Sequence, residues 1–186
     1  MHARFVRYPV ASTLWLIAAL AFAEPTTIRT FAIPEHGSLQ LSAPQSWPVE
    51  TRSAPNHPLP TIAFGPGEGA TYQVLVTPLP PAHKGQPSLA AGALKKMVEH
   101  AADDARAQSM EKSLAVKEFK SGAHVGYYFS ATDRAPRPDE FKYMTQGMFG
   151  LGDMLITFTI LTNDGYESVV PAALTMIRNA VELKDL

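Results

Sequence analysis

The sequence contains no cysteine in its 186 residues. This absence excludes disulfide bonds, catalytic thiolates, and zinc or iron–sulfur sites built on cysteine ligands. Basic residues are not in excess either, because 16 Lys and Arg residues stand against 17 Asp and Glu residues. A nucleic-acid-binding protein normally carries a basic patch or stripe, so we expect no nucleic-acid partner. Without covalent cross-links, the stability of the fold must come from its hydrophobic core.

Recognisable catalytic motifs are also missing. The Gly-x-Ser-x-Gly elbow of serine hydrolases is absent, and neighbouring carboxylates such as Asp103 and Asp104 are adjacent in sequence, which favours solvent over a shared proton. His100 and Asp104 are one helical turn apart, but without a second histidine this spacing favours a solvated helix face over a metal site. We therefore expect no catalytic residue, no metal site and no cofactor, and we predict that the protein is not an enzyme. The six histidines are scattered and no pair has ligand spacing: His2, His36, His57, His83, His100 and His124.

The chain has no apolar run long enough to span a membrane, but it begins with a shorter one. Arg4 and Arg7 precede the apolar stretch 10–22, and its uninterrupted part, 14–23, is shorter than the ~20 residues that a membrane span needs. The small residues around Phe22 are typical of a signal peptidase site, so we predict a signal peptide over 1–23 with cleavage after Ala23. An uncleaved membrane anchor is the alternative.

Cleavage leaves residues 24–186 as the mature protein, which has 186 minus 23, or 163, residues. The removed segment carries two arginines and no acidic residue, so the net charge becomes 14 minus 17, about −3. This length suits one domain with its own core. We expect a periplasmic or secreted protein that is not an integral membrane protein after cleavage.

The strongest secondary-structure signal is the alternating run 153–162. Met154, Ile156, Phe158 and Ile160 fall on one face at a period of two, and this face is wholly apolar. The other face is only half apolar, with Leu155, Thr157, Thr159 and Leu161. The pattern predicts a central strand in an antiparallel sheet, with helices packed on one side and a thinly covered second side.

The rest of the chain predicts a single α+β domain. Its antiparallel sheet would have six to seven strands, with one long helix and a C-terminal helix packed on it. Trp47, between two prolines, is expected to plug the core. The long helix would run from Leu89 to about Met110 after a Ser88 cap, and the second would begin near Glu167 or Ser168, with Val170, Leu174, Ile177 and Val181 on one side. Expected strands are 28–33, 38–42, 61–64, 71–77, 114–120, 124–132 and 141–149, while 53–60, with three prolines, is expected to be a loop.

Four stretches resemble the PsbP-like superfamily: Leu41–Trp47, Tyr72–Pro78, His124–Tyr128 and the strand, turn and helix over 155–177. That superfamily includes the extrinsic photosystem II protein, a nuclear Ran-binding factor and exported bacterial proteins. The resemblance would cover residues 28–184 and implies the architecture. None of these stretches is catalytic, so the resemblance implies no active site.

Two functions remain open at this stage. The first is a periplasmic interaction or accessory module that binds another, unidentified periplasmic or envelope protein. The second is a protein that binds a small apolar ligand or lipid in a cleft between the sheet and the long helix. The residues that could line such a cleft are Tyr127, Tyr128, Tyr143, Met144, Met148 and Met154, and their alternative is ordinary core packing.

Overall fold

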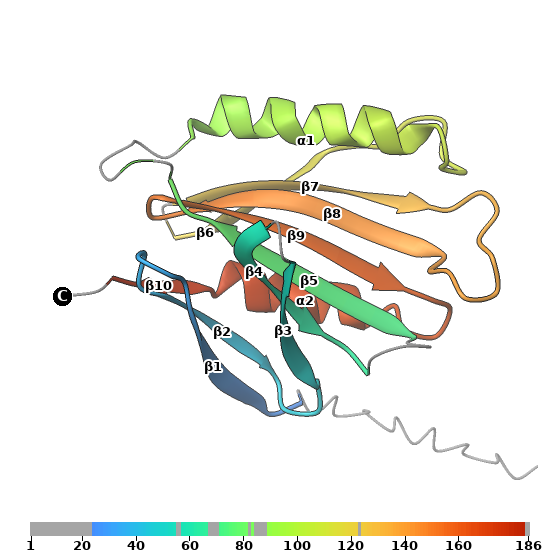
Figure 1. Cartoon of the computed structure of the whole chain (residues 1–186). Coiled ribbons are helices and arrows are strands. Elements are labelled where there is room, and N and C mark those ends of the chain that lie inside the picture. Colours follow the sequence, from blue (N-terminus) through green and yellow to red (C-terminus); the bar gives the residue numbers. More distant parts are fainter. Residues whose placement is uncertain are drawn as a thin grey trace, which may run out of the picture.

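The computed structural model describes residues 24–54, 57–66, 71–81, 83, 89–122 and 124–184. It contains two antiparallel sheets and two helices (Figure 1), which confirms the α+β class. The larger sheet has seven strands in the order β3-β4-β5-β9-β8-β7-β6, and the smaller has three in the order β1-β2-β10. The elements are β1 Thr26–Ala32, β2 Ser38–Pro44, β3 Val49–Ala54, β4 His57–Phe64, β5 Tyr72–Leu79, α1 Ala91–Arg106, β6 Lys117–Ser121, β7 His124–Thr132, β8 Tyr143–Leu151, β9 Met154–Thr162, α2 Val169–Arg178 and β10 Val181–Leu183.

The predicted central strand is β9, which lies in the middle of the large sheet between β5 and β8. Its even-numbered residues from Met154 to Ile160 are all buried, and the odd-numbered residues between them are half-buried. The alternation read from the sequence is therefore confirmed in register. Phe158, fully apolar and 2% exposed, points into the larger core.

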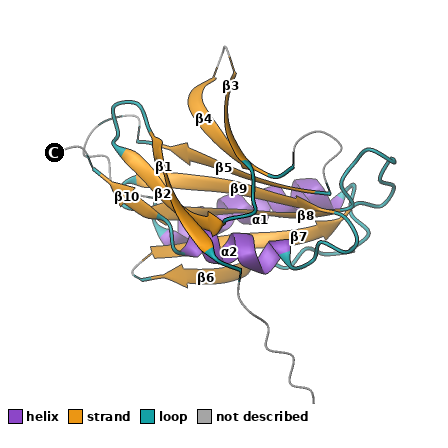
Figure 2. Ribbon diagram, turned by 90° about the horizontal axis from the view of Figure 1, so that it is seen from below, coloured by secondary structure: helices purple, strands orange, loops and turns teal. Residues whose placement is uncertain are grey.

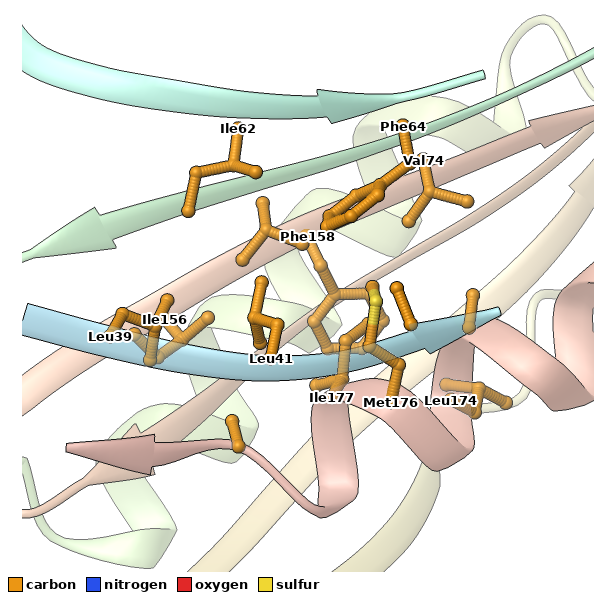
Figure 3. Close-up of a cluster of buried hydrophobic side chains, with 14 of the residues drawn as sticks. Leu39, Leu41, Ile62, Phe64, Val74, Ile156, Phe158, Leu174, Met176 and Ile177 are labelled. Atoms are coloured by element: carbon orange, nitrogen blue, oxygen red, sulfur yellow. The ribbon is translucent and has the colours of Figure 1, made fainter. Parts of the chain in front are cut away.

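That larger core lies between the two sheets and α2. Side chains from β2, β4, β5, β9 and α2 meet there, as Figure 3 shows for Leu41, Phe64, Phe158 and Ile177. Trp47 belongs to this core, is 5% exposed and packs against the Phe64 and Tyr72 rings, so it is the core plug that the sequence predicts.

The helices cover opposite faces of the large sheet, and the prediction that both pack on one side is wrong. In Figure 2 α2 lies in front of the strands and α1 behind them. The reason is that β7 points Tyr127, Phe129 and Ala131 away from the face that carries Phe158. A second apolar surface therefore needs its own cover, which Leu94 and other α1 residues supply.

The N-terminal hairpin does not join the large sheet. β1 and β2 pair as predicted, but β2 pairs on its other side with β10, a strand that the sequence analysis did not foresee. Helix α2 accordingly ends at Arg178, and Val181 lies in β10 with 47% of its surface exposed, instead of on the helix. A three-residue strand is too short to show an alternating pattern, which explains the error.

Residues 53–60 were expected to form a loop, but most of them belong to strands β3 and β4. Pro58 and Pro60 are tolerated because the pairing of β4 with β5 covers only Ile62–Phe64, and the register with β3 is irregular near Ala54. A proline lacks the N–H that a regular ladder would use, so it fits at such a place.

The helix ends also differ from the prediction. α1 begins at Ala91 after an Ala90 N-cap that makes no side-chain hydrogen bond, and it ends at Arg106. Ser88, the predicted cap, lies outside the described residues. α2 begins after Ser168 with Pro171 in its first turn, as predicted. Neither described helix is long and apolar enough to cross a membrane.

Candidate functional site

The residues predicted to line one cleft lie on both faces of the large sheet. Tyr127, Met144 and Met148 face α1 and belong to the smaller core or pack against it. Tyr128 lies on the opposite face beside Phe119, and Tyr143 shares that face. Met154 is 1% exposed inside the larger core. The structure therefore brings together three of these residues and not the whole set.

Beneath α1 the side chains fill the space between helix and sheet. Leu94 and Val98 pack on Phe129, and Tyr127 is 7% exposed beside them. The Tyr127 hydroxyl donates a hydrogen bond to Glu118 Oε2 at 3.3 Å. Burial and the negative charge of Glu118 raise the pKa of Tyr127. This part of the interface is packed core.

A pocket of about 360 Å³ opens next to the C-terminal end of α1. Ala105 and Gln108 form its helix side, and Met144 and Leu161 supply apolar surface from β8 and β9. Lys142 lines the pocket as well. Its size falls within the range of small-molecule sites.

Lys142 is held by an ion pair. Its Nζ lies 2.9 Å from both carboxylate oxygens of Asp164, and the Tyr143 hydroxyl donates to Asp164 Oδ1 at 2.6 Å. The Tyr143 hydroxyl and the Asp164 carboxylate raise the pKa of Lys142 to about 12. A lysine nucleophile needs a lowered pKa, so this ammonium group is suited to positioning and not to covalent chemistry.

The α1-facing side of the large sheet continues beyond this pocket. Helix α1 packs on β7 and β8, whereas α2 packs on the opposite face of β9, so neither described helix lies over β5 and β9 on the α1-facing side. On the four strands β4, β5, β9 and β8, the residues that face this side are uncharged. They are Thr61 and Ala63 of β4, Gln73, Leu75, Thr77 and Leu79 of β5, Leu155, Thr157, Thr159 and Leu161 of β9, and Met144, Gln146, Met148 and Gly150 of β8. Ala63 is buried, and the others are half-buried.

We call the β4, β5 and β9 part of this face the α1-side surface. Its threonines are joined, because Thr61 and Thr77 hydroxyls lie 2.9 Å apart and the Thr157 hydroxyl donates to the Thr77 carbonyl at 3.4 Å. Charge returns at the β3 edge, where Arg52 and Glu50 form an exposed ion pair. From this edge the Arg52 guanidinium reaches over to the side-chain amide of Gln73 on β5, whose oxygen accepts from Nη2 at 3.0 Å. A neutral centre with a charged edge is typical of surfaces that bind proteins.

The predicted helical pair His100 and Asp104 lies on the exposed side of α1. His100 Nε2 is 3.7 Å from Asp104 Oδ2, and their side chains are 81% and 72% exposed. Among the described residues, no three His, Asp or Glu side chains gather in a way that could hold a metal ion.

Comparison with known proteins gives a fold and no closer relationship. No protein-family model matches the sequence, and no curated protein matches it significantly. The solution structure of cyanobacterial PsbP (CyanoP) from Synechocystis sp. PCC 6803 is similar with a TM-score of 0.52 and 12% sequence identity, over 90% of this chain and 99% of that chain. A crystal structure from Bacteroides thetaiotaomicron VPI-5482 matches with a TM-score of 0.47 and 11% identity, over 79% of this chain and 46% of that chain.

The chain thus has a PsbP-like fold, which confirms the resemblance seen in the sequence. At 12% identity this likeness concerns the fold alone.

Sequence reasoning identified only part of the α1-side surface. The half-apolar face of 155–161 was recognised, because period-two alternation separates it from the buried face. The contribution of Leu75 and Thr77 was missed, since nothing in the sequence says that β5 lies beside β9. Gln108 and Lys142 of the pocket were also missed. They lie near the ends of an expected helix and an expected strand, and nothing in the sequence says that these two ends meet.

Proposed function

We propose that the protein is an exported, non-enzymatic accessory module that binds another protein through the α1-side surface. The observation that carries this proposal is the uncharged character of the residues listed above that β4, β5 and β9 direct to that side. The charges beside them come from Arg52 and Glu50 of β3, with the Arg52 guanidinium reaching Gln73. The centres of protein interfaces are depleted of charge in this way. The signal-peptide pattern over 1–23 supports export.

Two titratable groups, Glu111 and Lys142, have pKa values that do not suit catalysis near neutral pH. Burial opposes ionisation of Glu111, but hydrogen bonds from the Ser109 hydroxyl and from the N–H and hydroxyl of Thr132 outweigh it and lower the pKa of Glu111 to about 2. Such a carboxylate is too weak a base for general base catalysis near neutral pH. Lys142, with its raised pKa, is equally unsuited to nucleophilic catalysis.

Site-specific photo-crosslinking in cells tests the proposed surface. Benzoylphenylalanine is placed at Thr77 or Thr159 on the α1-side surface, and at Thr175, an exposed residue of α2 on the other side of the sheet, as the control. We expect one discrete adduct from the first two positions and none from the third. A Thr159→Arg change, which puts a charge at the centre, should remove the adduct formed at Thr77. Equal labelling at all three positions would contradict the proposal.

A second candidate function is the binding of a small apolar ligand in the 360 Å³ pocket. The observation that favours it is the pocket itself, with Met144 and Leu161 as apolar lining and Lys142 beside them. Native mass spectrometry of protein purified from its own compartment should then show a bound mass. Filling the pocket by Leu161→Trp should remove this mass, while Leu155→Trp, on the same face of β9 but outside the pocket, should leave it.

A further inference from the structure

Strand β1 leaves one of its two edges open. On one side it pairs with β2 over its whole length, from Thr26 opposite Pro44 to Ala32 opposite Ser38. On the other side it pairs with no described strand, and Figure 1 shows it in blue at the lower margin of the molecule. Along such an edge, N–H and C=O groups point outward without partners and can pair with an added strand.

β1 carries an arginine on its inner side. Arg29 lies opposite Leu41, which is fully buried in the larger core, so both side chains face inward. The guanidinium carbon is 6.0 Å from the centre of the Phe64 ring. The Nη1 atom is buried and has no hydrogen-bond partner among the described residues. A buried donor without an acceptor is costly, more so when it belongs to a charged group.

The remaining residues of β1 do not protect this edge. Between Thr26 and Ala32 there is no lysine and no proline, the register with β2 has no bulge, and Ile28 is 67% exposed. Edge strands that avoid association usually carry such features. Arg29 is the one charged residue in β1, and it decides which strands can be added.

The charge of Arg29 disfavours one kind of partner strand and favours another. A second copy of β1 would bring a second inward arginine close to the first, and like charges on neighbouring strands are destabilising. A strand with a carboxylate facing Arg29 would instead accept a charge-assisted hydrogen bond from the guanidinium, and that contact would satisfy the unpaired donor.

We propose that β1 binds an extended segment of another protein as an added β-strand, and that Arg29 selects a segment with Glu or Asp facing it. This site lies in the small sheet, apart from the α1-side surface, and it does not depend on the function proposed for that surface. The partner is thus defined by chemistry: an extended, largely neutral strand with an acidic residue on the side of Arg29.

The test uses the mature chain and three synthetic peptides. The peptide Thr-Val-Thr-Glu-Thr-Val-Thr places its two valines and its glutamate on one side of a strand, and two control peptides replace the glutamate by glutamine or lysine. Binding is followed by the chemical shifts of backbone amides. We expect the glutamate peptide to perturb β1 amides and to bind about tenfold more tightly than the lysine peptide, which is the scale of one charge-assisted hydrogen bond.

A charge exchange completes the test. In Arg29→Glu the preference should reverse toward the lysine peptide, and the amide spectrum itself shows whether this variant is folded. If it is not folded, the three peptides on the unchanged protein still decide the question. Equal binding of the glutamate and lysine peptides, perturbation outside β1, absence of binding, or a dimer that pairs β1 with itself would each overturn the proposal.

Discussion

Phe158 and Thr159 are neighbours in β9 with opposite environments. Phe158 is 2% exposed and its ring lies 6.0 Å from that of Phe119, whereas Thr159 is half-buried on the α1-side surface. Phe158→Ala should cost about 3–5 kcal/mol, because it leaves a cavity in the larger core. Thr159→Ala should cost well under half of that. Denaturant unfolding of both variants measures the difference.

This comparison matters because the total free energy of unfolding of a domain is only ~5–15 kcal/mol. At the lower end of that range the first change leaves the domain barely folded, whereas the second should hardly move the denaturant midpoint. Comparable losses at the two positions would show that the α1-side surface is as well covered as the core, and the proposed docking surface would then not exist.

Gly147 of β8 makes room for the core, and Gly150 of the same strand does not. A Cβ atom at Gly147 would clash with the Tyr127 carbonyl oxygen, and would lie 2.5 Å from Phe158 Cζ and 2.6 Å from Tyr128 Cβ. A Cβ at Gly150 would meet no atom within 4 Å.

Gly147→Ala should therefore destabilise the protein by about 1–3 kcal/mol, because backbone atoms cannot give way. Gly150→Ala is the matched control and should be neutral or slightly stabilising, since alanine loses less backbone entropy on folding than glycine does. Thermal or denaturant unfolding distinguishes the two. A similar loss in both variants would mean that the effect comes from the strand backbone and not from the close approach of Phe158.

At the level of elements, the edge of β7 depends on a short segment after α1. β6 covers only the first part of β7, up to Tyr128. Beyond that point Met110 N donates to the Thr132 carbonyl at 2.8 Å, and Glu111 accepts hydrogen bonds from the N–H of Thr132 at 3.0 Å and from its hydroxyl at 2.7 Å. A carboxylate therefore closes an edge that no strand covers.

This contact predicts a pH dependence. The pKa of Glu111 is lowered to about 2 in the folded protein, below its ordinary value of 4.5, so its stabilising effect is complete above about pH 4.5 and is lost as the pH falls toward about 2. Glu111→Gln should be less stable than the unchanged protein at neutral pH, and this difference should shrink between pH 4.5 and 2. Denaturant midpoints measured across that range give the answer. A difference that stays constant with pH would show that the ionised form is not what matters.

The elements that could be predicted from sequence are those with a long internal pattern. Residues 154–162 and 124–132 show period-two alternation over their full length, and both appear as the strands β9 and β7. β10 has only three residues, too few for an alternating pattern, so the strand was not predicted. The prolines of β4 are typical of loops, so part of that strand was predicted to be a loop. The face on which α1 packs depends on which strands are neighbours, and local sequence carries no such information. For the same reason, the residues predicted to line one cleft lie on both faces of the large sheet, and only three of them face α1.

For the whole molecule, the smaller sheet joins strands from near both ends of the described chain and packs them on the larger core. β2 lies between β1, near the start of the described chain, and β10, near its end. The smaller sheet then packs Leu39 and Leu41 against the large sheet and α2. The segment that follows the predicted cleavage site is therefore part of the fold, because β1 begins within two residues of Glu24.

The predicted cleavage after Ala23 would leave the first contacts of the described chain in place. Glu24 Oε1 accepts a hydrogen bond from the Ser46 N–H at 3.1 Å, and the Pro25 carbonyl accepts one from the Gln45 N–H at 2.9 Å. If cleavage follows Ala23, the intact mass and N-terminal sequence of exported protein should correspond to residues 24–186, and both hydrogen bonds are kept. A full-length, membrane-bound product would contradict this expectation. A chain shortened to begin at Thr27 loses both bonds and should be about 1–3 kcal/mol less stable in denaturant unfolding, at about 0.5–1.5 kcal/mol for each bond.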